Sequence, residues 1–269
     1  MSIRLKCPVC GKELADKGSS LVCEKNHSFD RARQGYVNLL PVQHKHSLIP
    51  GDNAEMLRAR RAFLDSGRYE PICNSVIDCI SQYAGREPRI ADIGCGEGYY
   101  TSRLKAMCPG EYIGIDISKD GARMSCSRDK DILWLVATAS RLPVCDGQLD
   151  GVCAIFSLLM PEEYARVLKE GGCVVEVTAG TDHLIELKSI IYDEVFEQNK
   201  HPSDCGELFE EAICREYRFG MTLDGGSLGE LLMMTPHIRR IHREKREKLG
   251  SIGSLGLTVH YWVRVLIKR

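Results

Sequence analysis

The sequence predicts an α/β protein, in which a parallel sheet with helices on both faces follows a small zinc-binding module. Three observations predict this. Short apolar runs alternate with amphipathic stretches between residues 89 and 178, as in sheets built from strand–helix–strand units. A glycine-rich turn at 94–98 follows the first of these runs, where such sheets bind cofactors. Three cysteines and a histidine are spaced as metal ligands between residues 7 and 27.

The first element is a predicted structural zinc site. Cys7 and Cys10 are separated by two residues, and Cys23 and His27 by three. Two thiolates at this spacing can point at one metal, and the Cys-x3-His pair completes a tetrahedron. Four protein ligands leave no position for water, which indicates a structural role. The alternative is a redox pair or a chance spacing, which the short polar loop at 12–20 disfavours.

The residues that follow mix aromatic and cationic side chains. Residues 1–70 hold 12 Lys and Arg against 8 Asp and Glu, although the whole chain has a net charge of −1. Stacking and phosphate contact need such side chains, so a surface for RNA is one interpretation; a solvated tail is the other. We expect residues 1–46 to form a zinc-binding RNA-recognition module. The candidate contacts are Phe29, Arg31, Arg33, Tyr36, Asn38, His44, Lys45 and His46.

Residues 47–85 are expected to form a helical lead-in to a catalytic domain that spans 47–269. The segment PGDN at 50–53 can cap a first helix that stops at Gly67, and Pro71 begins a second that ends near Gly85. Tyr69 lies in the joint between them. The first helix carries three arginines on its polar face, either as substrate contacts or as a solvated surface: Arg58, Arg60 and Arg61.

The glycine-rich turn is the predicted cofactor loop. Gly94, Gly96 and Gly98 allow positive φ and a close approach of the backbone to a ligand. Asp92 and Glu97 flank these glycines. A pyrophosphate would be repelled by two carboxylates, whereas the sulfonium and amino groups of S-adenosylmethionine would be attracted. The sequence therefore predicts S-adenosylmethionine as the cofactor.

A second acid supports this assignment. Asp116 follows Gly94 by 22 residues and closes the apolar run at 112–115, where its carboxylate can accept both ribose hydroxyls. A lone glycine turn would equally fit an ordinary strand-to-helix connection. The loop and the acid together resemble the signature of class I methyltransferases, which implies a Rossmann-like sheet.

The remaining elements follow from periodicity. We expect strands at 89–93, 111–116, 132–137, 149–156 and 172–178, with helices at 98–107, from 119, and at 161–169. A helix at 183–198 would be capped by Asp182 and would place His183 at the cofactor mouth. Strands at 212–223 and 257–267, with a helix at 226–235 between them, form an antiparallel closing pair. A cationic cluster at 239–248 is a second RNA candidate or a solvated helix.

Cysteine usage bears on the compartment. The chain has 13 cysteines, an odd number, mostly without paired spacing. It opens without a signal segment, and no run has the length of a membrane span. We therefore expect reduced cysteines in a cytoplasmic protein with no membrane partner.

Taken together, these features are similar to those of the bacterial 23S rRNA guanine-N1 methyltransferases of the RlmA type. The resemblance covers nearly the whole chain and rests on the zinc ligands, the run GYVNLLPVQHK at 35–45, and the segments 50–52, 60–64, 92–101, 183–188 and 234–236. It implies methyl transfer from S-adenosylmethionine to N1 of one guanine in a 23S rRNA hairpin, with zinc on the four ligands. It also implies that Tyr69, residues 96–97 and His183 contact the cofactor. Family members are described as homodimers, and some relatives confer macrolide resistance.

Two departures from the family pattern concern the target nucleotide. Where many relatives carry a proline directly after the fourth strand, this chain reads FSLLMP at 156–161, and past Pro236, where the family often has a tryptophan, it reads HIRR at 237–240. No general base is assigned, because Asp150 fits the start of a strand, and Glu162 and Glu163 fit a helix N-terminus, as well as they fit a base. The alternatives to an rRNA methyltransferase are a small-molecule methyltransferase with an accessory zinc module and a catalytically inactive RNA-binding protein.

Overall fold

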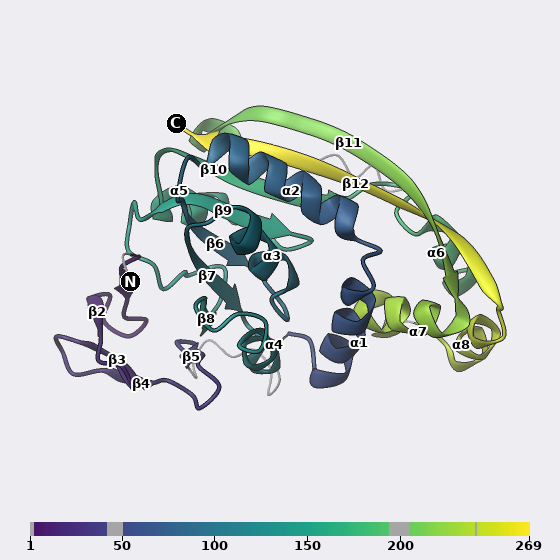
Figure 1. The fold of residues 1–269 in the computed structure, drawn as a ribbon, viewed down its shortest axis with the longest axis horizontal. Coiled ribbons are helices and arrows are strands. Elements are labelled where there is room, and N and C mark those ends of the chain that lie inside the picture. The colour runs from purple at the N-terminus through teal and green to yellow at the C-terminus, as the bar shows by residue number, and fades with distance from the viewer. Residues whose placement is uncertain (1–2, 42–50, 194–204, 240) are drawn as a thin grey trace.

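An eight-stranded sheet forms the centre of the protein in the computed structural model, which describes residues 3–41, 51–193, 205–239 and 241–269 (Figure 1). The five strands from β10 to β8 are parallel, and β12 and β11 close one edge antiparallel. This confirms the predicted parallel sheet with an antiparallel closing pair. The strand order is β11 (Phe209–Asp224), β12 (Ser254–Lys268), β10 (Leu168–Ala179), β9 (Leu149–Ile155), β6 (Arg89–Ile93), β7 (Glu111–Asp116), β8 (Leu133–Val136) and β5 (Val37–Asn38).

Two apolar cores cover the two faces of this sheet. One contains Phe63, Ile72 and Leu104 from the helices α1 (Ala54–Asp65), α2 (Glu70–Tyr83) and α3 (Tyr99–Met107). The other contains Tyr164 of α5 (Pro161–Val167) and Leu21 of the N-terminal module. Burial on both faces explains the continuous apolar runs of the parallel strands. The other helical segments are α4 (Lys119–Ser125), α6 (Ile185–Ile191), η2 (Gly206–Leu208), α7 (Gly225–Met234), η3 (Pro236–Arg239) and α8 (Arg243–Gly250).

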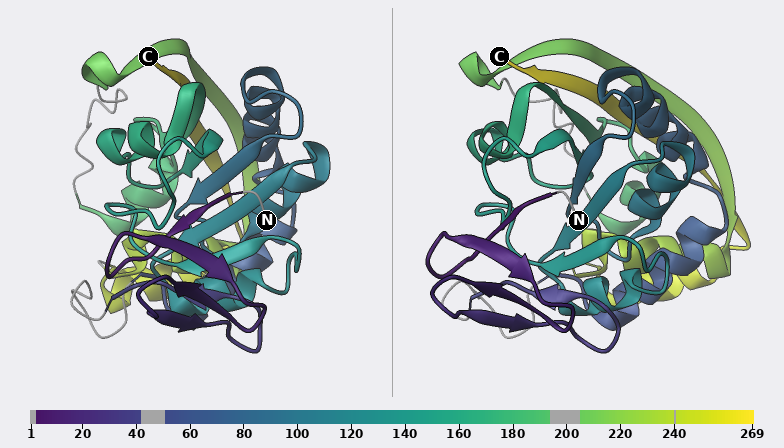
Figure 2. Two further views of the ribbon diagram at one scale, coloured as in Figure 1. Left: turned by 90° about the vertical axis from the view of Figure 1, so that its left-hand side faces the viewer. Right: turned by 60° about the vertical axis from the view of Figure 1, so that its left-hand side comes forward.

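The N-terminal module is a small antiparallel sheet that packs on the main domain. Its strands are β1 (Leu5–Lys6), β2 (Glu13–Asp16), β3 (Ser20–Cys23) and β4 (Ser28–Asp30). The amide of Lys6 donates to the carbonyl of Pro143, and the amide of Cys145 donates to that of Arg4, both at 3.0 Å. β5 then pairs parallel with β8, so the last strand of the predicted module belongs to the main sheet (Figure 2).

The helical lead-in agrees with its local signals. The Asn53 side chain accepts from the amides of Glu55 and Met56, each at 3.0 Å, and this caps α1 as predicted. Pro71 lies in the first turn of α2, where its missing N–H costs nothing. Every helix within the described ranges is too short or too polar to span a bilayer.

The predicted helix at 183–198 is wrong at its start. Leu184, not Asp182, is the N-cap of α6, with a left-handed φ of 56°. Its amide donates to Thr258 of β12 at 2.8 Å, so the turn is fixed by the sheet, and the Asp182 carboxylate pairs with Arg218 instead. α6 ends at Ile191; residues 194–198 of the prediction lie outside the described residues.

Candidate functional site

A cavity of about 440 Å³ opens at the carboxyl ends of β6 and β9. Ligands of open α/β sheets bind at this edge, and small-molecule sites have volumes of this order. The walls come from the glycine loop and α3, the loop after β9, the turn after β10, the α1–α2 region and the end of α7. The lining residues are 60, 64, 69, 94–97, 99–100, 155–157, 178–179, 183–184, 188, 234–235 and 237.

The glycine loop forms the floor of the cavity, and its three glycines have left-handed backbone conformations. The φ angles of Gly94, Gly96 and Gly98 are 77°, 57° and 85°. A Cβ on Gly94 would lie 2.3 Å from Oγ of Ser157, so the loop after β9 closes directly over the turn. Glycine is therefore required by both the backbone angle and the close approach.

The two predicted acids behind the loop hold it in place. Asp116 accepts from the amides of Gly96 at 2.8 Å and Ser118 at 2.7 Å. Asp92 accepts from the hydroxyl of Thr101 at 2.5 Å. Burial raises the pKa of Asp116 and raises that of Asp92 to about 7, although the bond from Thr101 opposes the second shift. Neither side chain is among those that line the cavity.

Glu97 lines the cavity, but two arginines bind its carboxylate. Nε of Arg61 donates to it at 2.9 Å and Nε of Arg128 at 2.8 Å. The side chain of Glu97 is 1% exposed, so its charge is compensated inside the protein. Arg61 is thus structural rather than solvated, and Arg60 likewise pairs with Asp52 at 2.7 Å.

Tyr69 and His183 meet at the opposite wall. The Tyr69 hydroxyl lies 3.4 Å from Nε2 of His183, whose Nδ1 lies 3.0 Å from the carbonyl of His260. A carbonyl can only accept, so Nδ1 carries a proton and donates to it, while Nε2 lies within reach of the Tyr69 hydroxyl. Burial raises the pKa of Tyr69, which keeps its hydroxyl a donor. The structure thus brings together Tyr69, His183 and the glycine loop from three distant segments.

Several cavity residues were not predicted from the sequence. Phe156 follows β9 and Thr178 lies at the carboxyl end of β10, and this position was the signal available for them. The hydroxyls of Tyr100 and Thr178 are buried and have no hydrogen-bond partner in the described part of the chain. Buried polar groups normally have partners. A polar ligand in the cavity can supply them, so the wall fits S-adenosylmethionine.

The four predicted metal ligands converge in the N-terminal module. Their ligand atoms all lie within 4.8 Å of one another. Nδ1 of His27 is 3.4 Å from Sγ of Cys23 and 3.6 Å from that of Cys7, and Sγ of Cys10 is 3.6 Å from that of Cys23. One Cys pair lies in the turn after β1, and Cys23 and His27 flank the turn between β3 and β4. Three sulfurs and one imidazole nitrogen at this spacing fit tetrahedral zinc.

The predicted RNA contacts at 28–46 have mixed placements. Tyr36 is buried, and Arg31 donates to Asp16 and to the carbonyls of Gly18 and Gly35. Arg33 is exposed. His44, Lys45 and His46 lie outside the described residues. In the second candidate region, α8 is exposed along most of its length, with an Arg243–Glu247 pair and a Lys245–Asp193 pair.

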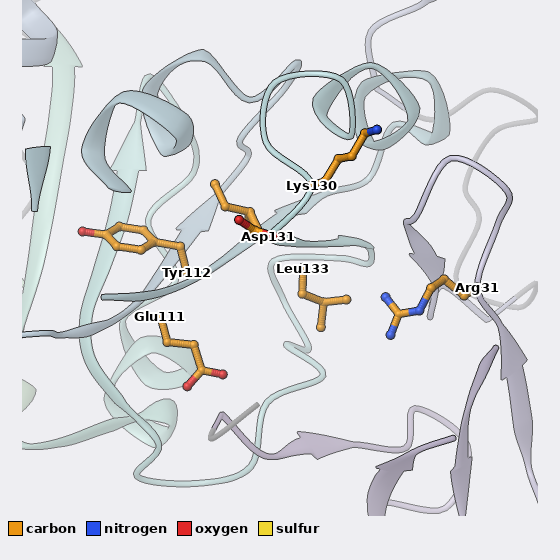
Figure 3. Close-up of a pocket in the computed structure, with 7 residues that line it drawn as sticks. Arg31, Glu111, Tyr112, Lys130, Asp131 and Leu133 are labelled. Atoms are coloured by element: carbon orange, nitrogen blue, oxygen red, sulfur yellow. The ribbon is translucent and has the colours of Figure 1, made fainter. Parts of the chain in front are cut away.

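A crevice of about 470 Å³ separates the N-terminal module from the sheet edge (Figure 3). Arg31 comes from the module, whereas Glu111, Lys130 and Asp131 come from the main domain. Charges of both signs therefore line it, and it offers no uniformly cationic surface to a phosphate backbone. The crevice is a seam between two packed parts rather than a second cofactor site.

The acids considered as general bases are engaged elsewhere. Asp150 accepts from the amide of Arg89 at 2.9 Å and pairs with Lys169. Glu163 accepts from the amide of Leu142 at 2.5 Å and pairs with Arg166 at 2.7 Å. None of the three acids, Glu162 included, lines the cavity.

Comparison with known proteins identifies both parts of the chain. Residues 5–48 match the family described as "RlmA, N-terminal", a zinc ribbon, and residues 90–174 match a methyltransferase domain. The chain is 31% identical to the 23S rRNA (guanine(748)-N(1))-methyltransferase of Streptomyces fradiae, with 86% of this chain and 84% of that protein covered. It is 35% identical to YxjB of Bacillus subtilis, provisionally named a 23S rRNA (guanine-N(1)-)-methyltransferase, with coverage of 86% and 85%. Among solved structures, the YcgJ protein of Bacillus subtilis matches with a TM-score of 0.48 at 17% identity, with 73% of this chain and 97% of that chain covered.

Proposed function

Since the chain belongs to the family of 23S rRNA (guanine-N1)-methyltransferases of the RlmA type, we propose that it methylates N1 of a guanine in 23S rRNA. The observation that carries this proposal is the combination of two sites in one chain: a glycine-loop cavity that fits S-adenosylmethionine and a Cys3His cluster that fits zinc. A methyltransferase fold alone would be shared with enzymes for small metabolites.

S-adenosylmethionine supplies an electrophilic methyl group when it is bound. In the transfer the methyl carbon would exchange its bond to sulfur for one to guanine N1, the neutral thioether would leave, and the N1 proton would pass to water. An in-line displacement depends mainly on close and aligned reactants. The residues proposed to hold the cofactor are Tyr69, Asp92, Gly94, Gly96, Glu97, Asp116 and His183, with Asp92 and Asp116 acting through the loop that they brace.

The zinc is proposed to be structural. Cys7, Cys10, Cys23 and His27 supply four ligands, which leaves no position for an activated water. The metal would instead fix the turns of the N-terminal module, whose exposed cations include Arg33. We further propose that this module contacts a hairpin of the rRNA and that the enzyme acts as a homodimer, as expected from the family.

The proposal is tested by methyl transfer in vitro. The purified protein is incubated with tritium-labelled S-adenosylmethionine and with an unmodified 23S rRNA hairpin transcript, and the RNA is then digested to nucleosides. Label in 1-methylguanosine is expected. Label in a small metabolite from a deproteinised extract, with none in the transcript, would favour a small-molecule methyltransferase, and absence of cofactor binding would favour an inactive RNA-binding protein.

A further inference from the structure

Three aromatic rings from distant segments meet at one wall of the cofactor cavity. Tyr69 lies between α1 and α2, Phe156 follows β9, and His183 precedes α6. The ring centroids are 6.4 Å apart for Tyr69 and Phe156, 6.3 Å for Tyr69 and His183, and 5.7 Å for Phe156 and His183. All three line the same cavity as Gly94 and Gly96. We call these three residues the aromatic triad.

Two backbone positions, one within the triad and one next to it, have left-handed conformations. Phe156 has a φ of 51°, a left-handed angle that is disfavoured for a residue with a Cβ. Its amide donates to the carbonyl of Val177 at 2.8 Å, which fixes the end of β9 against β10. Leu184, next to His183, has a φ of 56°. Strain of this kind accumulates at ligand sites, where the surrounding structure maintains it.

The carboxylates near the cavity are mostly engaged. Oε2 of Glu97 is bound by Arg61 and Arg128, while Oε1 is buried and has no hydrogen-bond partner in the described part of the chain. Asp92 accepts from the Thr101 hydroxyl, and Asp116 accepts from two backbone amides. At the wall formed by the triad, a cation in the cavity meets aromatic rings. Aromatic faces attract cations within about 6 Å of the ring centroid.

The hydrogen bonds of His183 suit this role. Its Nδ1 donates to the carbonyl of His260 at 3.0 Å, and its Nε2 lies 3.4 Å from the Tyr69 hydroxyl, so the ring is held at the cavity wall. Phe156 is 41% exposed, so it stands at the mouth, where the reacting end of the cofactor must face the substrate.

We propose that the aromatic triad binds the sulfonium of S-adenosylmethionine and distinguishes it from the neutral thioether of S-adenosylhomocysteine. This inference rests on the proposed function and specifies how the cavity recognises the charge of its cofactor. The charge is lost in the reaction, so the triad binds the substrate form of the cofactor more tightly than the product form. Release of the product is thereby favoured.

The test is calorimetry on the full chain with three ligands: S-adenosylmethionine, S-adenosylhomocysteine and sinefungin, whose amine is cationic. Phe156→Leu keeps an apolar side chain at the same backbone angle but removes the ring. We expect the affinity for the two cationic ligands to fall about 3- to 10-fold, as for the loss of one cation–π contact, with that for S-adenosylhomocysteine unchanged. Phe156→Tyr should restore the wild-type ratio. Leu158→Ala is the matched control, because Leu158 is exposed in the same loop and does not line the cavity.

Two results would overturn the inference and leave the proposed function intact. Equal losses for all three ligands would mean that Phe156 contributes shape alone. Unchanged affinities together with a raised KM for the rRNA transcript would instead assign Phe156 to stacking on the target guanine. A wild-type protein that bound none of the three ligands would contradict the proposed function itself.

Discussion

At the scale of single residues, the carboxylates around the cofactor loop mainly stabilise the conformation of the loop. The sequence predicts that Asp92 and Glu97 attract a sulfonium and that Asp116 accepts from the ribose hydroxyls. In the structure Asp92 accepts from Thr101, and Asp116 accepts from the amides of Gly96 and Ser118. Glu97 neutralises Arg61 and Arg128. These acids determine the conformation of the turn, and the turn determines the cavity.

Asp92 gives a prediction about pH. Burial raises its pKa from 3.8 to about 7 in the folded protein. Between these values the folded state binds more protons than the unfolded state, so the contribution of Asp92 to stability falls as the pH rises from about 4 to 7. Asp92→Asn removes this titration. We expect the difference in unfolding free energy, variant minus wild type, to increase across this window by at most about 4 kcal/mol and to level off above it.

Urea unfolding of both proteins at several pH values measures this difference. Asp120→Asn, on the partly exposed first turn of α4, is the control for the loss of one carboxylate. A difference for Asp92→Asn that is constant between pH 4 and 7 would show that Asp92 titrates normally.

Gly94 gives a second prediction at this scale. Gly94→Ala places a Cβ 2.3 Å from Oγ of Ser157 at a φ of 77°, so either the turn or the loop after β9 must move. We expect a loss of S-adenosylmethionine affinity of at least 10-fold. Gly147→Ala is matched, because Gly147 has a φ of 61° and nothing within 4 Å of the added atom. It bears only the backbone penalty, about 1–2 kcal/mol of stability. Calorimetric affinities that are equal for the two variants would rule out the close contact as a requirement.

At the scale of elements, the sequence predicted what local patterns determine. The strands from β6 to β9 follow from periodicity, and the start of α1 lies at the capping segment predicted at 50–53. The clustering of the four predicted metal ligands follows from their spacing. The start of α6 could not be predicted from local patterns. It is fixed by a hydrogen bond from the amide of Leu184 to the carbonyl of Thr258, in a strand more than 70 residues away. The pairing of β5 with β8 and the place of Phe156 in the cavity wall are likewise tertiary.

The N-terminal module gives the prediction at this scale. Cys10→Ser removes one metal ligand, and we expect the zinc content to fall well below one equivalent and rRNA methylation to fall at least 10-fold. Affinity for S-adenosylmethionine should change less than about twofold, because the cavity contains no residue of the module. Cys145→Ser is the control, since Cys145 is half-buried beside the module and is not a ligand.

Metal analysis, filter binding to the transcript and calorimetry separate these effects. Full zinc content in Cys10→Ser would exclude the proposed ligand set. Equal losses of RNA and cofactor binding would instead show that the module and the cavity do not have separable roles.

At the scale of the whole molecule, the module is fixed to the domain that carries the cavity. β5 adds a strand to the main sheet, and Leu5, Leu14 and Leu21 share an apolar core with Val144 and Leu142. If the module contacts RNA as proposed, a fixed distance between it and the methyl donor suits the selection of one nucleotide in a large RNA. The near-zero net charge of the chain means that RNA must be recognised by local surfaces rather than by the field of the whole protein.

The central claim is that this protein places a methyl group on N1 of one guanine in 23S rRNA. The most direct measurement is reverse transcription across 23S rRNA from a strain that lacks the gene, complemented with either the wild-type or the Gly94→Ala protein. N1-methylguanine blocks base pairing, so the wild-type rRNA should show one stop that is absent from the deletion strain and strongly reduced with Gly94→Ala. Identical profiles in the deletion and wild-type strains would contradict the account.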